Sequence, residues 1–248
     1  YFYSTKYIDF EYKKDNSPLT KADLEIDKMA TEGLKSIFPN DHIISEESSY
    51  RIDTLSHDKF WLIDPIDGTK EFLNKSENFT VNFGLIFLNR PVFGLIAQPC
   101  TENVWFSYNK KSWKITKGFN FEKATQITTP KFDVDNISLI ASKNHHNLDL
   151  ENWINLIKPK QEIYIGSSLK FCKMAEGEAN VYPRNLPTME WDTCAAHLIL
   201  SESGGELVCS SNGHVLEYNK ENLLNPFFIA FAHKLKPELF IKSFVKIT

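Results

Sequence analysis

The sequence predicts a mixed α and β protein whose first half belongs to the α+β class and whose second half belongs to the α/β class. Residues 80–108 alternate short apolar segments with turns, which is typical of an antiparallel sheet. Residues 137–209 alternate strand and helix patterns, which is typical of an α/β arrangement. The chain has 248 residues, of which 42% are hydrophobic, so it is long enough to bury a full core.

The first half is predicted to begin with a helix and a short strand. Thr20, followed three residues later by Asp23, resembles a capping box, and apolar residues continue at helical spacing up to Pro39. The pair Ile43-Ile44 predicts a strand that ends at Ser45-Glu46-Glu47.

The next predicted strand, Trp61–Ile63, leads into the segment Asp64-Pro65-Ile66-Asp67-Gly68-Thr69. Because Pro65 has no N–H and a fixed φ, we expect this strand to end at Asp64. Gly68 allows a tight turn and a close approach of the backbone to a ligand. Two neighbouring carboxylates repel each other unless a cation lies between them. The segment is therefore either an ordinary Asp-Gly surface turn or part of a metal site.

An antiparallel sheet is predicted next. Strands 80–88 and 91–97 form a hairpin through Asn89-Arg90, and 103–108 adds a third strand. The polar stretch 110–136, broken by Pro130, is the predicted boundary between halves. We expect an N-terminal α+β half, 1–135, with the antiparallel sheet and metal-binding motif, and a C-terminal α/β half, 136–248, with the substrate-recognition elements.

The second half is predicted to alternate strands and helices. The expected strands are 137–141, 162–165, 180–182 and 206–209. The expected helices are 148–157, 168–176 and 191–201. The sequence contains neither an internal repeat nor a low-complexity tract.

Composition excludes several classes of function. The formal net charge is −4 and no basic stripe is present, which argues against a nucleic-acid polymer as partner. No apolar run is long enough to span a bilayer, and no signal peptide is recognisable. The sequence has no HExxH motif, and its one His pair is His145-His146, so a zinc site is not expected.

The cysteines indicate a reducing, cytoplasmic environment. None of the four (Cys100, Cys172, Cys194 and Cys209) lies in a CxxC motif, so free and mostly buried thiols are expected. Cys172 and Cys194 lie beside apolar residues in helical patterns, which favours core packing.

Acidic residues stand at or next to the ends of several predicted elements: Asp23, Glu46, Asp64, Asp67 and Asp192. Taken singly, each has an ordinary explanation as a helix-capping or solvated carboxylate. Together they suit Mg²⁺, which prefers oxygen ligands and is commonly shared with substrate phosphates. Two such ions about 4 Å apart can bind both the attacking water and the leaving oxygen of a phosphate ester. Gly68 and Thr69 add backbone N–H groups and a hydroxyl for a phosphate.

Four sequence blocks resemble the signature motifs of the inositol monophosphatase superfamily in both order and spacing: Leu19–Asp23, Ser45–Glu47, Asp64–Thr69 and Trp191-Asp192. The resemblance implies a layered αβαβα sandwich. It also implies a Mg²⁺-dependent phosphomonoesterase that uses two to three ions.

The resemblance further implies a set of metal ligands. One ion is expected on Glu46, Asp64 and the Ile66 carbonyl, and a second on Asp64, Asp67 and Asp192. A third, weaker ion is expected on Glu46 and waters, so Glu46 is expected to be a catalytic residue.

Roles in water activation and phosphate binding are implied in the same way. Asp23 and Thr69 are expected to orient and activate the nucleophilic water. The N–H groups of Gly68 and Thr69 are expected to bind the phosphate, with Asp67 and Asp192 also facing the substrate.

Further motifs resemble the CysQ-type 3′(2′),5′-bisphosphate nucleotidase branch of this family. They are Lys70-Glu71-Phe72, Ile165–Cys172, Ala175-Glu176-Gly177, Tyr182-Pro183-Arg184 and Pro187–Asp192. The implied reaction is hydrolysis of 3′-phosphoadenosine 5′-phosphate to AMP and phosphate. Two alternatives stay open: a phosphatase for inositol or other small sugar phosphates, and a non-catalytic nucleotide or metal sensor on the same fold.

A substrate with two phosphates needs a second anion site away from the metal ions. Gly166, Ser167 and Ser168 stand before a predicted helix whose N–H groups can bind an anion. Lys170 offers a point charge, and Arg184 offers a planar fork suited to phosphate. Tyr182 lies either near an adenine or in the core. The resemblance allows a monomer or a homodimer in the cytoplasm, with peripheral attachment to the inner membrane face also allowed.

Overall fold

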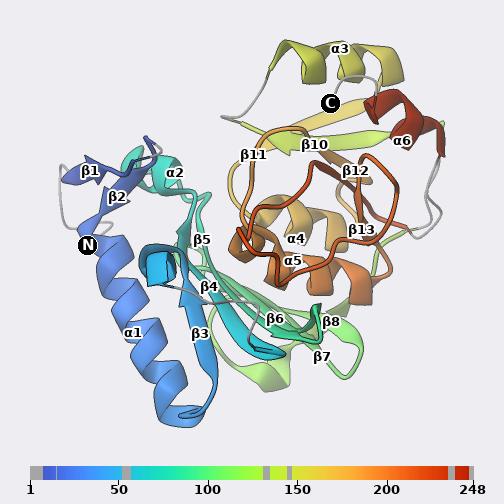
Figure 1. Cartoon of the computed structure of the whole chain (residues 1–248). Coiled ribbons are helices and arrows are strands. Elements are labelled where there is room, and N and C mark those ends of the chain that lie inside the picture. The colour runs from blue at the N-terminus through green and yellow to red at the C-terminus, as the bar shows by residue number, and fades with distance from the viewer. Residues whose placement is uncertain are drawn as a thin grey trace.

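The protein is a sandwich of five alternating helix and sheet layers (Figure 1). The computed structural model describes residues 8–14, 16–51, 57–130, 135–143, 147–233 and 238–245. Helix α1 (Lys21–Ile37) covers one face of a seven-stranded sheet, and α4 (Leu169–Ala175) and α5 (Glu190–Ser203) form the middle layer. A five-stranded sheet follows, with α3 (Leu148–Ile157) and α6 (Glu238–Val245) beyond it. The predicted αβαβα sandwich is confirmed.

The start of α1 is fixed by the predicted capping box. Strands β1 (Phe10–Tyr12) and β2 (Pro18–Thr20) form a small antiparallel pair that delivers Thr20 as the N-cap. The Thr20 hydroxyl accepts hydrogen bonds from the N–H groups of Ala22 and Asp23, and the Asp23 carboxylate accepts one from the Thr20 N–H at 2.8 Å. Asp23 is thereby held in the first turn of α1, only 1% exposed.

The seven-stranded sheet follows chain order. Its strands are β3 (His42–Ser45), β4 (Lys59–Asp67), β5 (Thr80–Phe87), β6 (Arg90–Gln98), β7 (Asn103–Tyr108), β8 (Lys111–Ile115) and β9 (Thr125–Ile127). β3 is parallel to β4, and the other neighbours are antiparallel. The stretch 110–136 was predicted as a polar boundary, but it contributes β8 and β9. Strands at the edge of a sheet carry solvent-facing polar residues. For this reason the hydrophobicity pattern did not predict β8 and β9.

Strand β4 contradicts the prediction that the chain leaves the sheet at Asp64. It continues to Asp67, which pairs with Thr80 of β5. The register shifts between Asp64 and Asp67, so Pro65 lies at an irregularity where its missing N–H interrupts no regular ladder. The bulge keeps both aspartates on a stiff strand end rather than on a free turn.

The five-stranded sheet has the order β11-β10-β12-β14-β13. Its strands are β10 (Ser138–Ser142), β11 (Gln161–Ile165), β12 (Val181–Arg184), β13 (Glu206–Cys209) and β14 (Phe228–Phe231). β10 is parallel to β11 and β12, whereas β14 is antiparallel to both of its neighbours. The predicted strands and helices of this region are present, and β14 and α6 were not predicted. The division into halves 1–135 and 136–248 stays a prediction.

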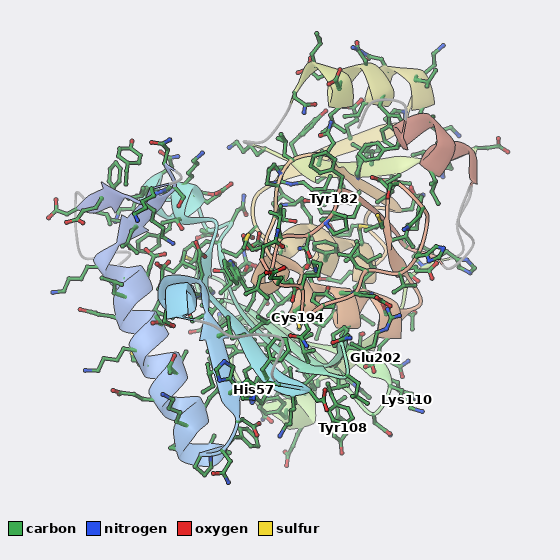
Figure 2. The ribbon with its side chains drawn as sticks, in the orientation of Figure 1. His57, Tyr108, Lys110, Tyr182, Cys194 and Glu202 are labelled. Atoms are coloured by element: carbon green, nitrogen blue, oxygen red, sulfur yellow. The ribbon has the colours of Figure 1, made fainter. Side chains whose placement is uncertain are left out.

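Helix α5 lies unusually close to the seven-stranded sheet. Gly84 of β5 and Gly94 of β6 are paired directly beneath it. A Cβ on Gly94 would lie 2.5 Å from the Ala195 carbonyl oxygen, and one on Gly84 would lie 2.2 Å from the sulfur of Cys194. Cys194, labelled in Figure 2, is fully buried at this contact. All four cysteines are free, and Cys172 is also fully buried, as predicted.

Replacing Gly94 with alanine is expected to lower the free energy of unfolding by about 1–3 kcal/mol. The atom that a Cβ meets is a helix carbonyl oxygen, which cannot rotate away as a side chain could. Chemical denaturation measures the change. Gly33→Ala in α1 is the matched control, because no atom lies within 4 Å of a Cβ there. Equal stabilities of the two variants would contradict the close packing of α5.

Two 3₁₀ turns and one short α-helix complete the description. They are η1 (Glu46–Arg51), η2 (Phe121–Lys123) and α2 (Thr69–Leu73), the last of which begins at the end of β4. None of the described helices is both long and apolar enough to cross a membrane. The predicted pair His145-His146 lies outside the described residues.

Candidate active site

A cavity of about 540 Å³ opens between the end of β4, helix α4, strand β12 and the start of α5. Its wall contains eleven of the predicted site residues: Glu46, Asp64, Ile66, Asp67, Gly68, Thr69, Ser167, Ser168, Lys170, Arg184 and Asp192. Asp23 and Gly166, the other two predicted site residues, do not line the cavity. Residues from both sheets and from the middle helices therefore meet at one place, although they are far apart in sequence.

The turn after β4 is built by Gly68. Its φ of +97° lies in the left-handed region, which a residue with a Cβ adopts only with strain. The turn lets Thr69 start α2, and the Thr69 hydroxyl is directed back at the Ile66 carbonyl (3.2 Å). The same hydroxyl lies 3.5 Å from the Asp23 carboxylate. The structure thus brings together the two residues predicted to activate the water, and that role stays a prediction.

Glu46 follows β3 and opens the short helix η1. Its carboxylate accepts a hydrogen bond from the Lys13 ammonium at 2.7 Å, and so does the carboxylate of Glu47. Burial lowers the pKa of Lys13, but Glu46 and Glu47 outweigh this effect and raise it above its usual value. Sequence analysis did not identify Lys13, because its only sequence signal is the pair Lys13-Lys14 before a turn. Its position shows that Glu46 attracts a cation.

The surroundings of Asp64 and Asp192 in the cavity favour the protonated, neutral form of these carboxyl groups. Burial raises the pKa of Asp64 well above its usual value, and the charges of Glu46, Asp67 and Asp192 add to the effect. Burial and the same neighbours, Asp67 and Glu46, raise the pKa of Asp192 to about 8. A group of this kind is stable in its charged form only when positive charge is nearby.

The donor set fits a hard divalent cation. Asp64 is 1% exposed, and its Oδ1 atom is buried with no hydrogen-bond partner among the described residues. An unsatisfied buried carboxylate oxygen is costly, and a metal ion satisfies it. Within the described ranges, no three Asp, Glu, His or Cys side chains form a ready-made cage. Mg²⁺ does not need one, because it keeps several waters and shares oxygens with its substrate.

Asp192 is fixed by the helix that it opens. It lies in the first turn of α5, where its Oδ2 atom accepts a hydrogen bond from the Met189 N–H at 2.8 Å. Its position at a helix start, predicted from the sequence, is confirmed. One carboxylate oxygen is held by the backbone, and the residue lines the same cavity as Asp64 and Asp67 of β4.

Two cationic side chains also line the cavity. Lys170 is 5% exposed, and its ammonium donates a hydrogen bond to the Ser167 carbonyl at 2.5 Å. Burial lowers its pKa to about 8, while Asp67 opposes this shift. Arg184 is 9% exposed and donates to the carbonyl oxygens of Leu186 (3.1 Å) and Pro187 (3.2 Å), which fixes its guanidinium beside the cavity.

The turn before α4 is rigid. Ser167 has a φ of +53°, and the Ser168 hydroxyl donates to Asn82 of β5 at 2.9 Å. A Cβ on Gly166 would lie 2.3 Å from the carboxylate of Glu71, so a larger residue there would displace the Glu71 side chain. Glu71, which also borders the cavity, was not among the predicted site residues. Its place in the Lys70-Glu71-Phe72 motif was the available signal.

Tyr182 is part of both the core and the cavity wall. It is 2% exposed and packs edge-on against Phe171 (5.1 Å between ring centroids) and Phe228 (5.6 Å). The Lys170 ammonium lies 5.4 Å from the centre of its ring. Figure 2 labels Tyr182, which lies in strand β12 of the five-stranded sheet and lines the cavity.

The comparisons with known proteins agree with this geometry. The model of the inositol monophosphatase family matches residues 3–248. The 3′(2′),5′-bisphosphate nucleotidase CysQ of Buchnera aphidicola is 37% identical over 92% of this chain and 86% of its own length. CysQ of Salmonella typhimurium is 35% identical over 90% and 89%, respectively. The crystal structure of CysQ from Bacteroides thetaiotaomicron superposes with a TM-score of 0.77 and 35% identity, covering 94% of this chain and 91% of that one.

Proposed function

The chain belongs to the inositol monophosphatase family, and on this premise we propose that it is a Mg²⁺-dependent phosphatase that hydrolyses 3′-phosphoadenosine 5′-phosphate to AMP and phosphate. One observation carries the proposal: a single cavity is lined both by carboxylates suited to metal ions and by two buried cations suited to a second phosphate. The relatives named 3′(2′),5′-bisphosphate nucleotidase support the choice of substrate. The free thiols support a reducing, cytoplasmic compartment.

The residues proposed to bind metal, water and the scissile phosphate have separate roles. Glu46, Asp64, the Ile66 carbonyl, Asp67 and Asp192 would hold two to three Mg²⁺ ions. When bound, these ions lower the pKa of a coordinated water and neutralise charge on the phosphate. Thr69 and Asp23 orient the attacking water, because the threonine hydroxyl lies between the aspartate and the cavity. The N–H groups of Gly68 and Thr69 bind phosphate oxygens.

Two cationic residues of the cavity account for a second phosphate. Lys170 and Arg184 place two positive charges in the lining of the cavity, and both are more than nine-tenths buried. Charges held in such surroundings bind phosphate more strongly than exposed ones. A monophosphate of inositol or of a sugar leaves these charges unpaired, so the enzyme is expected to prefer the bisphosphate.

A phosphate-release panel tests the substrate. With Mg²⁺ in excess, 3′-phosphoadenosine 5′-phosphate is expected to give a kcat/KM at least about tenfold higher than inositol monophosphate, since unpaired buried charges cost affinity. Lys170→Met is expected to raise the KM for the nucleotide more than the KM for inositol monophosphate. The ratio of the two kcat/KM values should therefore decrease. Faster turnover of inositol monophosphate by the wild type would overturn the substrate proposal in favour of the sugar-phosphate alternative. Nucleotide binding without turnover would favour the sensor.

A further inference from the structure

The first turn of α5 is held by one loop that stays away from the cavity. Residues 217–225, which we call the clamp loop, run antiparallel past residues 188–190, with a bridge between Leu224 and Met189. Thr188, Met189 and Trp191–Thr193 all border the cavity. None of the clamp loop does, although all of it lies within the described stretch 147–233. Its influence on the cavity must therefore pass through the start of α5.

Glu190 is the centre of this attachment. Its side chain is fully buried, at 0% exposure, yet it belongs to a charged residue at the first position of a helix. Three donors of the clamp loop bind its carboxylate: the Asn219 N–H (2.8 Å), the Lys220 N–H (3.0 Å) and the Lys220 ammonium (2.5 Å). A buried carboxylate with three donors holds a defined position, because moving it would strand a charge without partners.

Asn225 fastens the other end of the clamp loop. Its amide donates to the Met189 carbonyl (2.7 Å) and to the Thr193 hydroxyl (3.0 Å), and its N–H donates to the Thr188 carbonyl (2.9 Å). The Glu190 N–H in turn donates to the Leu223 carbonyl at 2.8 Å. The clamp loop is thus bound to residues before Asp192 (188–190) and to the residue after it (Thr193).

We propose that Glu190 is a positioning residue that, through the clamp loop, fixes the carboxylate of Asp192 for Mg²⁺. Asp192 stands two residues after Glu190, and the Met189 N–H that binds its Oδ2 belongs to the same attached segment. A small rotation of the first turn of α5 would change the direction of the Asp192 carboxylate. Mg²⁺ tolerates little deviation from octahedral geometry, so such a rotation weakens its binding. The inference rests on the proposed metal dependence.

Calorimetric titration with Mg²⁺ alone, without nucleotide, tests the proposal. In Glu190→Gln, which keeps the size of the side chain but removes its charge, the dissociation constant for Mg²⁺ is expected to rise about tenfold, as for other residues that support metal ligands. Lys220→Met keeps both backbone donors and is expected to give a smaller rise. The kcat at subsaturating Mg²⁺ should fall in the same order, while the KM for nucleotide at saturating Mg²⁺ changes little.

The matched control is Glu217→Gln on the same loop. Glu217 forms an exposed ion pair with Arg90 and is expected to leave Mg²⁺ binding unchanged. Thermal unfolding without metal separates positioning from mere stabilisation. A lower unfolding temperature with a dissociation constant within twofold of wild type overturns the proposal. If Glu190→Gln does not fold, the dissociation constant of Lys220→Met decides by the same criterion.

The two proposals fail in different ways. A wild-type protein that binds Mg²⁺ but leaves the nucleotide intact refutes the proposed substrate, while the titration still decides the role of Glu190. A wild-type protein that binds no Mg²⁺ overturns both.

Discussion

Replacing Asp67 with asparagine is expected to lower phosphate release by at least about a hundredfold while the protein stays folded. Asp67 ends β4, lines the cavity together with the other carboxylates, and lies within the electrostatic influence of Lys170. Asparagine has the same size and can still accept the hydrogen bond that the Asn82 amide donates to Asp67 at 3.3 Å. What it loses is the negative charge, and with it the expected bond to the metal.

Phosphate release at several Mg²⁺ concentrations measures this loss, and thermal unfolding confirms that the variant is folded. Glu178→Gln removes an acidic group from an exposed ion pair with Lys173 and should leave activity at the wild-type level. Unchanged turnover in Asp67→Asn would refute the metal assignment. Loss of turnover that more Mg²⁺ fully restores would show that Asp67 contributes to metal affinity alone.

The predictions that succeeded rest on short-range chemistry. The capping box of Thr20 and Asp23, the hairpin between β5 and β6, and the turn at Gly68 are each determined by a few neighbouring residues. The signature motifs then placed Asp64, Asp67 and Asp192 around one cavity. Local sequence patterns cannot predict that these three aspartates meet, because β4 and α5 are more than a hundred residues apart. The resemblance to a family supplied that long-range information.

The features that sequence analysis missed depend on partners distant in sequence. Lys13 becomes part of the site only because β1 and β2 bring it beside Glu46. Glu190 looks like an ordinary acid at a helix start until the clamp loop covers it. The expected end of β4 at Asp64, before Pro65, was wrong, because a bulge lets a strand continue past a proline.

Without metal, the protein is expected to lose stability on the order of 1 kcal/mol between pH 6.5 and pH 7.5, and excess Mg²⁺ is expected to add about 3–4 kcal/mol at pH 7.5. The pKa of Asp192 is raised to about 8 and that of Asp64 lies well above its usual value, both mainly by burial. In the unfolded chain these groups release their protons near pH 4. The folded state therefore binds more protons than the unfolded state in this interval, and stability falls as the pH rises.

The interval limits the contribution of groups that act in the opposite direction. Burial lowers the pKa of His197 to about 3, so below pH 6.5 the unfolded chain binds a proton that the folded chain does not, and stability there rises with pH. Burial also lowers the pKa of Lys170 to about 8, and its deprotonation likewise lets stability rise with pH above that value. Between these limits the carboxylates dominate. Thermal unfolding with chelator and with Mg²⁺, at both pH values, measures the difference.

Asp64→Asn gives this prediction its sharpest form. Without metal at pH 7.5, the variant is expected to be more stable than the wild type, because the wild type must either keep a proton on Asp64 or bury its charge in order to fold, and asparagine does neither. With Mg²⁺ it should gain little stability and no activity. Glu178→Gln should follow the wild type in both conditions. A metal-free Asp64→Asn that is less stable than the wild type would mean that Asp64 is held in the fold by partners other than a cation, and the carboxylate cavity would no longer require one.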